Sequence, residues 1–169
     1  MAFEPVALTA ERVVEALRER GLTVAVAESL TGGLLVSALV EVPGASAVLN
    51  GGVVAYATEI KASLLGVDPG LLARAGAVDS RVAEQMADRV RAVLAVEGRP
   101  ADVGVATTGV AGPEPQDGHP VGEVFVGFAR GDRVFSTRLQ LSGDRAHIRK
   151  AVVSEALTGL RKLLDGAGE

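Results

Sequence analysis

An acid and two hydroxyl groups stand where a buried-looking strand turns into a helix near the start of the chain. The run TVAVAESLTGG (residues 23–33) passes from five strand-like residues into Glu-Ser and then into a Thr-Gly-Gly turn. In α/β sheets, ligands bind in the crevice beyond the carboxyl ends of the strands. A helix N-terminus there offers free backbone N–H groups, and Gly32 and Gly33 would let an oxyanion approach them closely. Ser29 is therefore a candidate nucleophile beside an anion site.

A purely structural explanation of the same residues stays open. Small residues permit a strand to pack tightly against a helix, with Ser29 or Thr31 as the N-cap of that helix. The run contains neither the Walker phosphate loop nor the GxGxxG dinucleotide fingerprint. Glu28 has no assigned role, because it could bond nearby backbone groups or orient a base.

A serine nucleophile needs a base, and the chain offers three candidates. His119 lies in a Gly/Pro-rich loop and His147 near the start of the last helix, and no other histidine exists. Lys61 lies in AYATEIKASLLG among apolar neighbours. Burial among apolar groups lowers the pKa of a lysine, and a neutral amine can deprotonate a serine. A Ser-Lys pair is favoured over a Ser-His-Asp triad, with a solvated surface lysine as the alternative for Lys61.

Two further clusters follow a strand or begin a helix. Thr107, Thr108 and Gly109 end a predicted strand in ATTGVAGP and would line the same crevice if that strand neighbours the first. In SGDR, Asp144 is a candidate N-cap, and the planar fork of Arg145 suits a phosphate or carboxylate. The alternative for SGDR is a capped helix that carries solvated basic residues, which include Arg149 and Lys150.

The elements that must position these residues alternate helix and strand before ending in a hairpin and a helix. Periodicity and turn residues predict strands at 23–27, 51–56, 102–107, 121–129 and 134–141. They predict helices at 9–20, 32–42 and 58–65, a short one ending near 75, and others at about 80–96 and 144–164. We therefore expect an α/β fold, a three-layer α/β/α sandwich with a mixed sheet. The loop 109–120 is long enough to be functional.

Composition restricts the class of protein. The 169 residues have the length of one domain, and 48% of them are apolar. The chain has no cysteine, which excludes disulfides, thiolate zinc sites and cysteine nucleophiles. The sequence shows no cluster of metal ligands, no signal peptide and no apolar run long enough to span a membrane. With a net charge of −4 and no tryptophan, we expect a cytoplasmic protein without metal, nucleic-acid or membrane partners.

Five segments together resemble the CinA C-terminal family: AESLTGG, GGVVAYATEIK, ATTGVAGP, PVGEVFVG and SGDR. The resemblance runs from about residue 8 to 164, with the segments in the order and spacing of the family, and implies one domain over residues 1–169. Stand-alone members are nicotinamide-nucleotide amidases (NMN deamidases). The resemblance implies hydrolysis of the carboxamide of nicotinamide mononucleotide to nicotinic acid mononucleotide and ammonia, without a cofactor.

The matched positions imply roles for individual residues. Ser29 corresponds to the nucleophile and Lys61 to its base, with Tyr56 nearby as a third catalytic candidate. Arg145 corresponds to an active-site position and would hold the ribose phosphate, assisted by threonines of ATTG. The substrate-binding and oxyanion-binding residues implied in this way are Thr31, Gly32, Gly33, Thr107, Thr108, Gly109 and Arg145.

Two positions and one loop depart from the usual pattern of the family, and other functions stay open. Leu30 replaces the usual Cys, Asp79 replaces a Ser, and the loop 114–119 lacks the usual glycine-rich, Lys-containing sequence. These changes affect substrate affinity more than reaction type. One alternative is a non-catalytic nucleotide-binding or competence- and DNA-damage-associated interaction module. Another is a different amide or ester hydrolase. We expect a homo-oligomer, with a dimer as the first expectation. No residue pattern decides the oligomeric state.

Overall fold

A mixed sheet of five strands forms the centre of the molecule. A computed structural model describes residues 5–166. The strand order is β2-β1-β3-β4-β5, with β1 parallel to β2 and β3 and with antiparallel pairing from β3 to β5. The strands are β1 (Val24–Glu28), β2 (Leu49–Val54), β3 (Val103–Gly109), β4 (Glu123–Arg130) and β5 (Arg133–Gln140).

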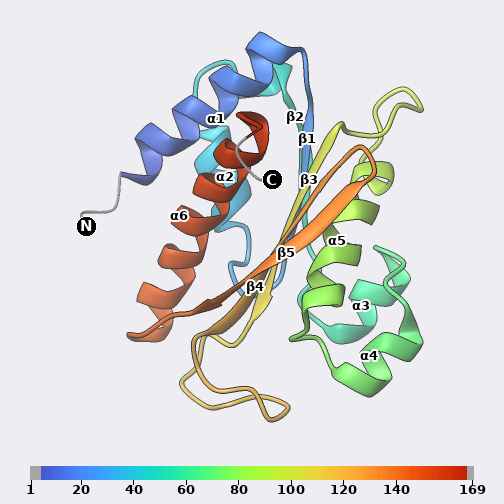
Figure 1. The fold of residues 1–169 in the computed structure, drawn as a ribbon, viewed down its shortest axis with the longest axis vertical. Coiled ribbons are helices and arrows are strands. Elements are labelled where there is room, and N and C mark those ends of the chain that lie inside the picture. The colour runs from blue at the N-terminus through green and yellow to red at the C-terminus, as the bar shows by residue number, and fades with distance from the viewer. Residues whose placement is uncertain (1–4, 167–169) are drawn as a thin grey trace.

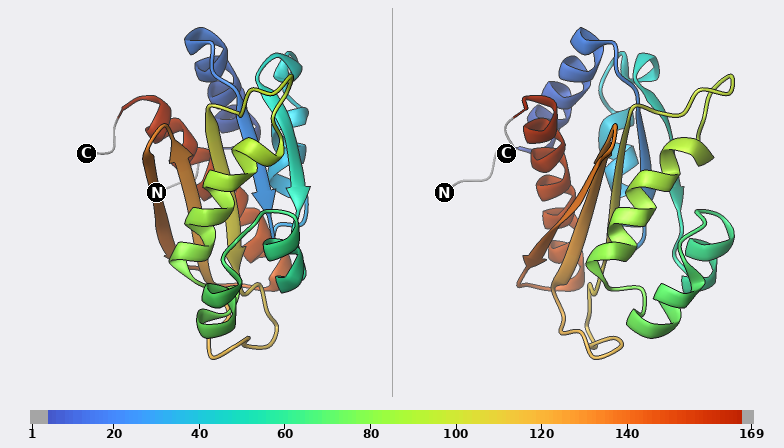
Figure 2. Two further views of the ribbon diagram at one scale, coloured as in Figure 1. Left: turned by 90° about the vertical axis from the view of Figure 1, so that its right-hand side faces the viewer. Right: turned by 45° about the vertical axis from the view of Figure 1, so that its right-hand side comes forward.

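Helices cover both faces of the sheet, so the expected three-layer α/β/α sandwich is confirmed (Figures 1 and 2). One face carries α1 (Val6–Arg20), α2 (Leu34–Val40) and α6 (Arg145–Leu164). The other carries α5 (Ser80–Val93), and α3 (Thr58–Ser63) and α4 (Pro69–Ala75) lie beside the lower end of α5 in Figure 1. A short 3-10 helix, Ala45–Ala47, precedes β2.

The alternation of side chains along β1 explains the two layers. Val24 and Val26 belong to the apolar cluster under α1, α2 and α6, whereas Ala25 and Ala27 belong to the cluster under α5. Successive strand residues point to opposite faces, so each face contributes its own half of the core. On the α5 face the residues are small because the helix approaches closely. A Cβ on Gly104 would lie 1.8 Å from the carbonyl oxygen of Ala87.

Three predicted helices are shorter in the structure: the one predicted at 58–65 ends at Ser63, and the other two differ for local reasons. The second helix begins at Leu34 and not at residue 32, because Gly32 and Gly33 adopt φ angles of 58° and 99°. Such positive φ angles do not continue a right-handed helix. The long helix ends at Val93 and not at residue 96, because Val96 pairs with Arg99 in a short bridge.

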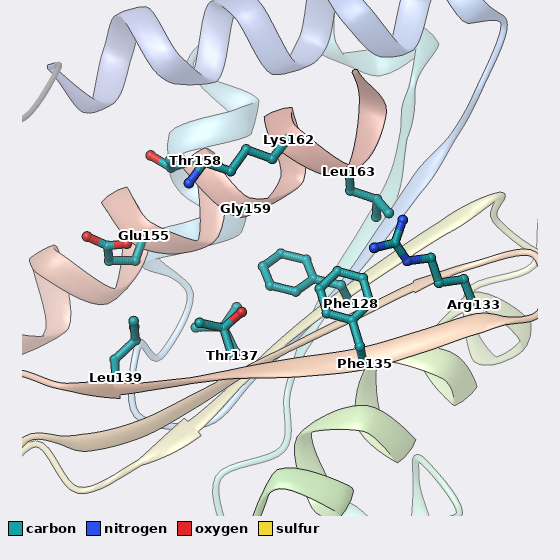
Figure 3. A pocket seen from close by; sticks show the side chains of 11 residues that line it. Phe128, Arg133, Phe135, Thr137, Leu139, Glu155, Thr158, Gly159, Lys162 and Leu163 are labelled. Carbon is teal, nitrogen blue, oxygen red and sulfur yellow. The ribbon is translucent and has the colours of Figure 1, made fainter. Parts of the chain in front are cut away.

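Two cavities lie at different places on this framework. The carboxyl ends of β1, β2 and β3 meet at the lower end of the sheet in Figure 1, above the loop that joins β3 to β4, and the first cavity opens there. The second lies between α6 and the strands β4 and β5, around Phe128 and Phe135 (Figure 3). Within residues 5–166, no helix has the length and apolar character needed to cross a membrane.

Candidate active site

Ser29 directly follows β1, at a corner that the neighbouring strand holds in place. Its N–H donates to the carbonyl oxygen of Thr107 on β3 at 3.0 Å, and its carbonyl oxygen accepts from the N–H of Gly32 at 3.1 Å. The hydroxyl oxygens of Thr31 and Thr107 lie 2.8 Å apart. The parallel pairing of β1 and β3 therefore fixes the backbone on both sides of the candidate nucleophile.

Lys61 reaches Ser29 from α3, which begins shortly after the end of β2. Its Nζ lies 3.0 Å from Oγ of Ser29. The same Nζ donates to the carbonyl oxygens of Ala55 at 2.7 Å and Tyr56 at 3.2 Å. A neutral amine has two N–H donors and one lone pair, which matches two carbonyl acceptors and one hydroxyl donor. The geometry thus suits a base that accepts the proton of Ser29.

Burial changes the acidity of this lysine. The residue is 1% exposed, and desolvation lowers the pKa of Lys61 from 10.5 to about 8, while the nearby Glu59 carboxylate acts weakly in the opposite direction. Taking an ammonium group out of water disfavours its charged form. A pKa near 8 leaves about one molecule in ten with a neutral lysine at pH 7. The electrostatics therefore agree with the hydrogen-bond geometry.

Glu28 binds backbone groups and does not contact Lys61. Its carboxylate is fully buried and accepts from the N–H groups of Gly33 at 3.0 Å, Leu35 at 3.1 Å and Val36 at 2.8 Å. A negative charge at a helix N-terminus is stabilised by these free donors and by the helix dipole. Glu28 therefore anchors the start of α2 directly behind Ser29. Of the two roles that the sequence left open for Glu28, it bonds backbone groups and does not orient the candidate base Lys61.

This anchoring changes which backbone donors are available. The N–H groups of Gly32 and Gly33 were expected to bind an oxyanion, but they already donate to Ser29 and Glu28. Leu30, the residue after the nucleophile, lines the cavity, and its N–H donates no hydrogen bond within the described part of the chain. The N–H of Thr31 likewise donates no hydrogen bond to the described residues, but Thr31 does not line the cavity, so Leu30 supplies the unbonded N–H at the cavity wall beside Ser29.

The cavity in front of these groups has a volume of about 140 Å³. Ser29 and Lys61 line it together with Thr108 and Gly109, as the sequence predicted. Thr31, Gly32, Gly33 and Thr107, also expected at the site, lie behind the nucleophile, where they support its loop. The residues that complete the wall are Leu30, Tyr56, Thr58, Ala77, Val78, Val110, Ala111, Gly112, Glu114, Gln116 and Arg145.

Arg145 and Tyr56 stand at the rim of the cavity. The guanidinium of Arg145 donates to the carbonyl oxygen of Gly112 at 2.7 Å and to the hydroxyl oxygen of Tyr56 at 3.2 Å. The side chain of Tyr56 therefore pairs with Arg145, and only its backbone carbonyl contacts Lys61. Because both partners of Arg145 are neutral, its positive charge stays available to an anion that enters the cavity.

The comparison with known proteins assigns the chain to a family. A family model described as the CinA C-terminal domain matches residues 7–164. The chain belongs to the CinA C-terminal domain family. A CinA-like protein of Frankia casuarinae is 52% identical over 154 residues, which cover 91% of this chain and 34% of that protein. This CinA domain spans about a third of the length of the curated relatives that it matches.

Solved structures of CinA proteins have the same fold. A CinA superfamily protein of Klebsiella pneumoniae superposes with a TM-score of 0.90 at 29% identity, covering 96% of this chain and 99% of that one. A competence/damage inducible protein of Agrobacterium tumefaciens gives a TM-score of 0.85 at 34% identity, covering 98% and 99%. The expected family and fold class are both confirmed.

Neither histidine of this CinA domain lies at the cavity. Nδ1 of His119 lies 2.8 Å from a carboxylate oxygen of Glu123, and the N–H of His147 donates to Asp144 at the start of α6. A Ser-His-Asp triad around Ser29 is therefore not formed. Within residues 5–166, no group of three or more His, Cys, Asp and Glu side chains could hold a metal ion.

Arg149 is a site residue that sequence reasoning missed. Its Nε donates to the carbonyl oxygen of Leu30 at 2.8 Å, and its second guanidinium nitrogen donates to that of Thr31 at 3.0 Å. The sequence had grouped it with the solvated basic residues of a capped helix. Its spacing of four from Arg145 could have suggested otherwise, because residues four apart share one face of a helix.

Proposed function

We propose that this CinA domain hydrolyses the carboxamide of nicotinamide mononucleotide to nicotinic acid mononucleotide and ammonia. The observation that carries the reaction type is the 3.0 Å contact between Oγ of Ser29 and Nζ of the buried Lys61, whose pKa is about 8. A hydroxyl beside a base that is partly neutral at physiological pH is an activated nucleophile. The substrate follows from the resemblance of five segments to the stand-alone amidases of the family.

The reaction proceeds through an acyl-enzyme. Neutral Lys61 accepts the hydroxyl proton of Ser29 as Oγ bonds to the carboxamide carbon, and the carbonyl oxygen becomes an oxyanion. The N–H of Leu30 donates to that oxyanion, as the N–H of the residue after the nucleophile does in α/β-hydrolases. Lys61 then gives its proton to the leaving nitrogen, so that ammonia departs. Water, deprotonated by Lys61, hydrolyses the ester and restores Ser29.

The rim of the cavity supplies the recognition of an anion. Among residues 5–166, no carboxylate forms an ion pair with Arg145, and its guanidinium has a fixed orientation through its bonds to Gly112 and Tyr56. Arginine recognises phosphate through parallel N–H donors. The ribose phosphate of the substrate would lie against Arg145 while the carboxamide reaches Ser29. A local positive rim also explains how a chain with a net charge of −4 accepts an anionic nucleotide.

Ammonia release tests the proposal. Purified protein should release one ammonia per nicotinamide mononucleotide consumed, with nicotinic acid mononucleotide as the other product. Nicotinamide and glutamine, which lack the nucleotide phosphate, should give no release. The absence of ammonia from a folded preparation, with binding of the mononucleotide seen by calorimetry, would favour a nucleotide-binding module. Equal turnover of unphosphorylated amides would favour a different hydrolase.

A further inference from the structure

Arg149, in the first turns of α6, is hydrogen-bonded to the loop that carries Ser29. Arg149 spans 119 and 118 positions of sequence to bond the carbonyl oxygens of Leu30 and Thr31. Both of its acceptors are neutral backbone groups of the turn between β1 and α2. The half-buried guanidinium therefore holds backbone that lies directly beside Ser29 and contributes no atom to the lining of the cavity.

The two hydrogen bonds determine the orientation of peptide planes. In a trans peptide the N–H points away from the carbonyl of the same plane. The plane before Leu30 is held by the bond from the N–H of Gly32 to the carbonyl oxygen of Ser29. The plane after Leu30 is held by Nε of Arg149. The N–H of Leu30 belongs to the first of these planes and Arg149 fixes the second, so the peptide planes on both sides of Leu30 are held.

Gly32 is shaped to admit the guanidinium. A Cβ at this position would lie 3.2 Å from a terminal nitrogen of Arg149, which is closer than side chains normally pack. Its φ of 58° also belongs to the left-handed region that favours glycine. The glycine of the TGG turn therefore serves the arginine as well as the turn. The sequence had assigned it to the approach of a ligand.

We propose that Arg149 is a positioning residue for the hydrolysis, which stabilises the position of the oxyanion-binding N–H of Leu30 by holding the next peptide plane, while the bond from Gly32 to Ser29 holds the plane that contains this N–H. The expected effect on kcat rests on the proposed function. The ordering of the loop that carries Ser29 by Arg149 is a property of the fold and does not depend on that function. An oxyanion donor acts mainly in the transition state, so its loss lowers kcat and leaves KM almost unchanged.

Three substitutions distinguish the effect of the hydrogen-bond geometry of Arg149 from the effect of its positive charge. Arg149→Ala removes the guanidinium, and Arg149→Lys keeps the charge but cannot bond both carbonyls in the same fork. Lys150→Ala is the matched control, because it removes a positive charge from the next, exposed position of the same helix. We expect kcat to fall roughly ten- to hundred-fold in both Arg149 variants, with KM within twofold of the original, because a small displacement of a reacting group has such an effect.

Addition of ethylguanidinium at millimolar concentration should restore part of the turnover of Arg149→Ala and leave Lys150→Ala unchanged. Unaltered kcat in Arg149→Ala, or an effect of Lys150→Ala equal to it, would overturn the proposal. Thermal unfolding of each variant establishes that the comparison is made between folded proteins. A larger change in KM than in kcat would also overturn it, because Arg149 would then act on substrate binding.

Hydrogen exchange gives a readout that does not depend on amidase activity. Peptides spanning residues 28–36 should exchange faster in Arg149→Ala than in the original protein and in Lys150→Ala, while peptides from β3 and β4 stay unchanged. Unchanged exchange in residues 28–36 contradicts the positioning role, whatever the activity. If the original protein releases no ammonia, the proposed function fails, and the exchange experiment alone still decides whether Arg149 orders the loop.

Discussion

Two cavities of nearly equal volume differ completely in their chemistry. The cavity between α6 and strands β4 and β5, about 150 Å³, has an aromatic floor, with the rings of Phe128 and Phe135 stacked at 5.3 Å (Figure 3). The strand-tip cavity, about 140 Å³, holds a buried lysine against a serine hydroxyl. Volume and apolar lining therefore do not locate the candidate active site. A buried titratable group with a reactive neighbour does.

The position of charge explains the difference. At the aromatic cavity the guanidinium of Arg133 lies 4.8 Å from the ring centre of Phe135, and Lys162 on α6 is exposed at the rim, so both cations keep contact with water. At the strand tips Lys61 is almost completely buried, so its amino group has almost no contact with water. Burial at the strand tips lowers the pKa of Lys61 to about 8. Burial of Lys61 thus distinguishes the strand-tip cavity as the candidate active site.

The largest expected effect is on turnover at the strand-tip cavity. Ser29→Ala removes the nucleophile and Lys61→Met removes the base, and each should lower kcat at least about a thousand-fold, since residues that act as a unit are lost together. Thr158→Val, a change of similar size in the aromatic cavity, should keep the original kcat. Ammonia release from nicotinamide mononucleotide measures all three. Near-original rates in either Ser29→Ala or Lys61→Met would remove the proposed pair.

The sequence predicted the residues that line the strand-tip cavity more fully than the residues that hold its backbone in place. The β1 corner, the apolar setting of Lys61 and the fork of Arg145 are local patterns, and the parallel pairing of adjacent strands brings such corners together. The contacts of Arg149 connect positions more than a hundred residues apart, so its spacing of four from Arg145 could place it on the same helix face but could not identify its bonding partners. Glu28 was ambiguous because its three acceptor contacts depend on where α2 begins.

The aromatic cavity gave no signal in the sequence at all. Phe128 and Phe135 lie on neighbouring strands and pair directly across the hairpin of β4 and β5, which the turn residues predicted. The hollow beside them depends on how α6 lies on the sheet, including the absence of a side chain at Gly159. How a helix packs on a sheet is a matter of tertiary structure, and the periodicity of a single element does not predict it.

The second prediction reverses the first, because the aromatic cavity should govern stability and not turnover. Phe128→Leu removes a buried ring and its stacking contact with Phe135, and should lower the free energy of unfolding by about 2 kcal/mol. Urea denaturation measures the loss, and kcat per folded molecule should stay at the original value. Ser29→Ala should show the opposite pattern, with stability retained and turnover lost. A tenfold fall of kcat in folded Phe128→Leu would show that the two cavities are coupled.

The smallest effect concerns pH and comes from Lys61. Because the lysine must be neutral to accept the proton of Ser29, kcat/KM should rise with pH through about 8 and fall about tenfold for each pH unit below it. The Glu59 carboxylate favours the charged lysine and so raises the pKa of Lys61. Glu59→Gln should therefore lower that pKa and move the whole profile to lower pH.

Glu155→Gln provides the matched control, since it removes a carboxylate from the wall of the aromatic cavity and should leave the profile in place. Added salt should reduce the difference between the original protein and Glu59→Gln, because Glu59 is exposed and its field is screened. Equal displacement by both substitutions would show that net charge, and not the neighbourhood of Lys61, sets the profile. A profile without a step near pH 8 would mean that the buried lysine is not the base, whichever cavity binds the substrate.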